Sequence, residues 1–202
     1  MGKRLHRLLH AEYLAVWEAV AAEIGGTWNS PGFGEDARIE VAHPAGTIVI
    51  ESDVTHVMMG KILVPVLSTI FSVSLPTVPA RRFSVSRATF AASVAEWFGQ
   101  LDIQVDDETF DRSFVLKGDT PDFVRQLFAD ASLRAQYLAD FEGSLALKDD
   151  TSFFSDPTPG YDPLELTVSG IIDDAARLRR LYALFAATLK RIATTSVGSA
   201  AS

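Results

Sequence analysis

The chain has 202 residues, 48% of them hydrophobic, and at about 150 residues per domain its length favours a single soluble globular domain. Eighteen Lys and Arg against 26 Asp and Glu give a net charge of −8, which disfavours a broad basic surface for nucleic acid or anionic membranes. The absence of cysteine excludes disulfide scaffolds, thiol catalysis, thiolate zinc sites and cysteine-held iron–sulfur clusters.

Two segments have some features of a targeting or membrane signal. The basic start of the chain is interrupted by His10 and Glu12, so the apolar stretch of a signal peptide is missing. The uncharged run 62–80 contains three prolines and alternates with a period of two, which indicates a β-strand rather than a membrane-spanning helix. We therefore expect a cytoplasmic protein of bacterial type, without membrane contact.

The first half of the chain predicts one helix followed by strands. Apolar residues spaced three and four apart predict an amphipathic helix over 4–24, and Gly25-Gly26 suits its end. The next expected elements are a hairpin of 38–42 and 47–52, a strand over 63–75, a strand over 82–86 and a helix over 88–98.

The second half predicts strands and helices in alternation. Thr120, Pro121 and Asp122 form a typical helix start, with an N-cap, a first-turn proline and a carboxylate. Asp173 is the expected cap of the last helix. The remaining expectations are strands over 101–105 and 112–116, a helix that breaks at 130–132 and continues over 133–141, and paired strands over 144–148 and 164–168.

This order of elements predicts an α+β fold with a mostly antiparallel sheet. We expect the helices to pack on one face, with long helices at the N-terminal and C-terminal ends. The prediction is a single domain over 1–193, with a possible subdivision near 88–100. The small polar residues of 194–202 predict a disordered tail.

The chain lacks the glycine-rich nucleotide loops and the Gly-x-Ser-x-Gly elbow of serine hydrolases. Asp106, Asp107 and Asp111 concentrate negative charge in one segment, where paired carboxylates could bind a divalent cation or share acid–base work. The segment lacks the spacing of a calcium-binding loop, so we interpret it as a solvated turn. His6 and His10 are four apart on the first expected helix, but without the His-Glu-x-x-His glutamate we interpret them as part of a polar face.

Three arginines surround two phenylalanines in the only compact basic and aromatic stretch. Arg81, Arg82 and Arg87 lie beside Phe83 and Phe90, an arrangement that can receive a carboxylate, a phosphate or an acidic partner. In a chain of charge −8, this predicts a local anion or partner contact at most.

The segment from Phe110 to Gly118 has the pattern Phe-Asp-x-x-Phe-x-x-x-Gly and is followed by a leucine-rich helix. It resembles an uncharacterised family of bacterial proteins, and the resemblance implies no known activity. The residues themselves predict folding roles, because Phe110 and Phe114 are four apart, Asp111 can cap a turn, and Gly118 can adopt a positive φ.

Three functional hypotheses remain open from the sequence. The first is a non-catalytic binding or accessory module that recognises a protein partner and needs no cofactor. The alternative is a carrier of a small molecule or lipid, with an apolar pocket lined by the 64–75 strand and Arg81 or Arg82 at an acidic headgroup. The third is a metal-dependent hydrolase that uses the carboxylates of 106–111.

Overall fold

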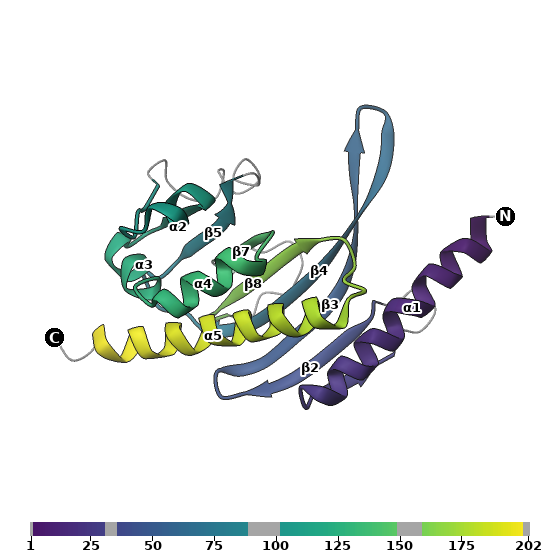
Figure 1. Ribbon diagram of the computed structural model, residues 1–202, viewed down its shortest axis with the longest axis horizontal. Helices are drawn as coiled ribbons and strands as arrows, with labels where there is room; N and C mark the ends of the chain where they lie inside the picture. Colours follow the sequence, from purple (N-terminus) through teal and green to yellow (C-terminus); the bar gives the residue numbers. More distant parts are fainter. Residues whose placement is uncertain (1, 31–35, 89–101, 149–158, 200–202) are drawn as a thin grey trace.

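A computed structural model of the protein describes residues 2–30, 36–88, 102–148 and 159–199 (Figure 1). Within them, one sheet has the strand order β1-β2-β3-β4-β8-β7-β5-β6, and every neighbouring pair is antiparallel. The predicted α+β class and antiparallel sheet are therefore confirmed. The strands are β1 Thr27–Asn29, β2 Arg38–His43, β3 Gly46–Met59, β4 Ile62–Pro76, β5 Phe83–Arg87, β6 Phe114–Gly118, β7 Ser144–Leu147 and β8 Tyr161–Ser169. The helices are α1 Gly2–Glu23, α2 Glu108–Ser113, α3 Pro121–Leu127, α4 Ala131–Asp140 and α5 Ala175–Ser199.

One row of buried apolar side chains crosses the sheet from β2 to β6. Directly opposed residues of an antiparallel pair place their side chains on the same face, so the strand register defines this row. We call it the apolar row. Its members in spatial order are Ile39, Ile50, Phe71, Leu166, Leu145, Val85 and Leu116.

α5 packs against this face, and α1, α3 and α4 pack against α5. Figure 1 shows α5 lying across the sheet with α4 beside it. The Phe185 ring of α5 lies 6.1 Å from the Phe71 ring of the apolar row. Tyr137 of α4 hydrogen-bonds to Thr188 of α5 at 3.0 Å, and both side chains are buried. Trp17 joins α1 to this core, because its indole Nε1 donates to the Ile172 carbonyl at 2.7 Å.

The segment after residue 101 differs from its prediction. Residues 102–105 form no strand; Ile103 makes a single backbone hydrogen bond to Leu116 at 2.8 Å. The acidic residues that follow start α2 instead of a turn between strands, because Asp107 is the N-cap and accepts from the Phe110 amide at 3.1 Å. As a result, β6 begins at Phe114, two residues later than the alternation predicted. The helix expected over 88–98 lies almost wholly outside the described residues.

The last helix also differs at both ends. Asp174 rather than Asp173 caps α5, since its Oδ1 accepts from the Arg177 amide at 2.6 Å. The helix continues to Ser199, so 194–199 are helical where a disordered tail was expected. Thr194 supports this extension, because its hydroxyl donates to the Lys190 carbonyl of the preceding turn at 3.2 Å.

Gly118 has a different role from the one expected. Its φ is not positive, but a Cβ there would lie 2.8 Å from Val124 Cγ2 and 2.9 Å from the Arg82 carbonyl oxygen. Glycine is therefore required by the close approach of α3 and the segment before β5, and not by a left-handed backbone.

Replacing Gly118 with alanine should destabilise the fold by about 3 kcal/mol, because the new methyl group meets a backbone oxygen and a fully buried valine. Gly60→Ala is the matched control: its Cβ would enter open space, although Gly60 has a φ of +65°. That variant should lose only about 1 kcal/mol. Urea unfolding of the two variants measures the difference, and an equal loss would contradict the steric explanation.

Candidate functional site

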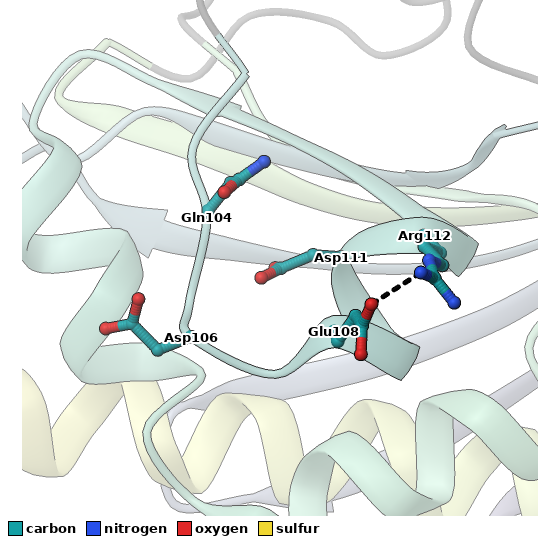
Figure 2. A pocket seen from close by; sticks show the side chains of 5 residues that line it. All are labelled: Gln104, Asp106, Glu108, Asp111 and Arg112. Carbon is teal, nitrogen blue, oxygen red and sulfur yellow. Dashed lines mark hydrogen bonds and ion pairs between the residues drawn. The ribbon is translucent and has the colours of Figure 1, made fainter.

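The acidic segment lines a shallow pocket of about 470 Å³ (Figure 2). Figure 2 shows the Glu108 carboxylate directed at Arg112, with which it forms an ion pair, and the Asp106 carboxylate on the far side of the pocket. Asp111 accepts a hydrogen bond from the Val105 amide at 3.1 Å. Asp111 therefore closes the turn that leads into α2, and the three carboxylates do not converge on one point.

Asp107 is not among the described residues that line that pocket, and it holds two elements together. Its Oδ1 caps α2, and its Oδ2 accepts from Arg134 Nε of α4 at 2.9 Å. The hydrogen bond from the Phe110 amide, followed by Arg134, lowers the pKa of the Asp107 carboxyl below its usual range. No group of three or more His, Asp or Glu side chains in the described part of the chain is arranged to hold a metal. The side chains of His6 and His10 lie outside that part.

The three arginines of the predicted anion contact have different partners. Arg82 Nε forms an ion pair with Asp119 at 2.7 Å. Arg87 donates to the Phe141 carbonyl at 2.8 Å, where it supports the end of α4. The Arg81 guanidinium lies 5.9 Å from the centre of the Phe123 ring and lines a separate apolar pocket. They do not form one site, and Phe90 lies outside the described residues.

The sequence did not single out the surface that is most unusual in the structure. β3 and β4 remain paired with each other well beyond the point where their pairing with the outer neighbours β2 and β8 ends. β2 pairs with β3 only as far as Glu51, and β8 pairs with β4 only from Ser68 onward. The remaining two-stranded hairpin, which we call the ribbon, comprises residues 54–67 and projects from the sheet (Figure 1).

Seven of the eight exposed large apolar side chains in the described part of the chain lie on the ribbon. They occupy both of its faces, because side chains alternate along a strand. The only charged residue in the ribbon is Lys61, next to Gly60 in the turn. Single exposed apolar residues are ordinary, but a continuous group of them marks an interaction surface. The seven are Val54, Val57, Met58, Ile62, Leu63, Val66 and Leu67.

Acidic groups surround the base of the ribbon. Glu51 and Asp53 lie on β3 just before it, and Asp36 is close to both. Burial, assisted by Asp53, raises the pKa of Asp36. Burial also raises the pKa of Glu51, although Arg38 lies 3.3 Å from its carboxylate and opposes the shift. The ribbon is therefore an apolar projection on a negatively charged base.

One signal in the sequence could have revealed the ribbon. The strands predicted over 47–52 and 63–75 have unequal lengths, and the intervening 53–62 includes Val57, Met58 and Met59. A hairpin that continues through this apolar stretch must outgrow a six-residue neighbour such as β2.

Comparison with known proteins does not assign a family: no protein-family model matches the chain, and no curated protein is significantly similar to it. In the described part of the chain, no helix is both long and apolar enough to cross a membrane.

Asp107→Asn should lower stability at neutral pH, because it removes the charge that pairs with Arg134 and faces the start of α2. The folded-state pKa is depressed, so this contribution is present above the ordinary value of 3.8 and is lost as the pH falls through the lower folded value. Thermal unfolding across pH 2–7, a range set about the ordinary carboxyl pKa, should show wild type and variant converging at the acid end.

The matched control is Asp122→Asn, which removes an exposed carboxylate paired with Arg125. This variant should change the pH dependence of the unfolding temperature little. A difference in unfolding temperature between wild type and Asp107→Asn that stays constant over the whole pH range would contradict the role assigned to the Asp107 charge.

Proposed function

We propose that the protein is a non-catalytic cytoplasmic binding module that inserts its ribbon into an apolar groove of a protein partner. The observation that carries this proposal is the concentration of exposed apolar side chains on residues 54–67. A groove suits the ribbon better than a flat surface does, because a flat surface would cover only one of its two apolar faces.

Charge favours a protein over a lipid surface. The base of the ribbon carries Asp36, Glu51 and Asp53, and the chain as a whole has a charge of −8. Anionic lipid headgroups would repel these carboxylates, and Lys61 alone offers little compensation. An apolar groove bordered by basic residues would complement both the ribbon and its base.

The attachment of the ribbon to the sheet also supports a binding role. β3 and β4 are flanked by β2 and β8, so the ribbon continues two interior strands of the sheet. Ile50 of β3 and Phe71 of β4, both in the apolar row, fix the register of the two strands. Each lies four residues from the nearest residue of the ribbon. A projection with a fixed base loses less conformational entropy on binding than a mobile loop does.

The hydrolase hypothesis receives no comparable support. Asp107 is occupied as a helix cap and ion-pair partner, and Asp111 closes a turn. The carrier hypothesis has a specific observation in its favour, an apolar pocket far from the ribbon, which is considered below.

A photo-cross-linking amino acid at Met58, introduced in the native host, should capture a protein through the ribbon. The captured protein, once purified, should bind the wild-type chain and lose at least about tenfold in affinity for Leu63→Asp, because a carboxylate cannot be desolvated in an apolar groove at no cost. Isothermal titration calorimetry measures both affinities, and thermal unfolding shows that the variant is folded.

Tyr161→Asp is the control, since Tyr161 is the one exposed large apolar residue of the described chain outside the ribbon. It should bind the partner like wild type. Cross-links to lipid alone, or equal binding by wild type and Leu63→Asp, would overturn the proposal.

A further inference from the structure

An apolar pocket of about 330 Å³ opens at the end of β4 opposite the ribbon. Its walls come from the β2–β3 turn, the end of β4, the segment before β5, β7, and residues 189–193 of α5. This volume is at the lower end of the range of small-molecule sites. We call it the α5 pocket, and its lining is Pro44, Ala45, Leu75, Pro76, Val78, Arg81, Leu147, Leu189, Ile192 and Ala193.

Among the described residues that line the pocket, Arg81 is the only one with a charged or polar side chain. A guanidinium beside an apolar cavity matches a ligand that has an apolar body and one terminal anion, because guanidinium binds a carboxylate through two parallel hydrogen bonds. We propose that the α5 pocket binds an amphipathic carboxylate, with its chain among the apolar walls and its carboxylate on Arg81.

The backbone before Arg81 is held in an unusual conformation. Ala80 has a φ of +63°, a region that alanine rarely occupies, and its carbonyl accepts a hydrogen bond from Thr120 Oγ1 at 2.7 Å. The Phe123 ring contacts the Arg81 guanidinium from α3. Strained residues persist where the surrounding structure fixes them, often beside a binding site. The backbone before Arg81 and the ring beside its guanidinium are thus both held by α3 and its N-cap, next to the pocket that Arg81 lines.

The dimensions and charges of the pocket narrow the ligand class. At about 30 Å³ for each water-sized group, 330 Å³ accommodates roughly eleven such groups, which is enough for a ten-carbon chain. Asp162 lies directly across from Leu75 on β8, where it accepts a hydrogen bond from Thr77 Oγ1 at 2.8 Å. Arg81 would balance only part of the charge of a dianionic phosphate, and the nearby Asp162 carboxylate would repel it. A monoanion therefore fits better.

The location differs from the one that the sequence predicted for a carrier. The 64–75 strand contributes only its last residue, Leu75, to the lining. Leu63 of the ribbon lies roughly 40 Å away along the same strand. The proposal is therefore independent of partner binding by the ribbon, and either can fail alone.

Isothermal titration of the full chain with sodium decanoate, kept below its micelle concentration, tests the proposal. We expect saturable one-to-one binding that weakens about tenfold or more in Arg81→Met. Decan-1-ol, which lacks the anion, should bind wild type more weakly by a similar factor. Arg125→Met, which removes an exposed arginine of α3 outside the pocket, is the control and should leave the decanoate affinity unchanged.

Ala193→Trp tests the position of the chain separately, because Ala193 is an exposed lining residue and an indole there should fill the cavity and abolish binding. It keeps the proposal testable if Arg81→Met does not fold. Absence of decanoate binding by wild type, full affinity in Ala193→Trp, or equal binding of decanoate and decan-1-ol would each overturn the proposal.

Discussion

The apolar row is the constraint on which the rest of the structure depends. It runs through seven strands that come from distant parts of the sequence, and it unites them under α5. A slip of one residue in any strand would turn its apolar side chains to the opposite face, so burial of the row sets the whole register. The critical junction is the pairing of β4 with β8, where Phe71 lies opposite Leu166, because it alone joins β1–β4 to β7, β5 and β6.

Both proposed binding surfaces are consequences of the length of β4. The apolar row occupies the middle of this strand, where β3 and β8 flank it. At one end, β4 and β3 continue beyond their outer neighbours, so no strand of the described chain pairs with the ribbon. At the other end, β4 stops near residues 189–193 of α5, and Arg81, which follows the turn at Ala80, lines the cavity between them. A single strand thus holds two chemically different surfaces well apart.

Local patterns were sufficient to predict most of the elements, and non-local contacts account for the failures. Alternation located β2–β4 and the β7–β8 pair, because each buries one face of a sheet. The same period predicted strands over 101–105 and 112–116, but residues 102–105 form no strand, and α2, which Asp107 caps, includes Arg112 and Ser113. The reason for Gly118 lies in the distant Val124 and Arg82, and the ribbon exists only because other strands end early. Arg81, Arg82 and Arg87 are close in the sequence, but each contacts a different residue far along the chain, which their spacing could not reveal.

The ribbon carries features that direct it toward side-chain contacts and away from strand addition. Its two outer edges have no strand beside them in the described chain, and such edges ordinarily invite pairing with another chain. Pro65 has no amide hydrogen to donate at the middle of the β4 edge, and Lys61 places a charge at the tip. Both features oppose edge-to-edge association. The apolar faces remain exposed, which is the arrangement expected of a projection that enters a groove instead of extending a sheet.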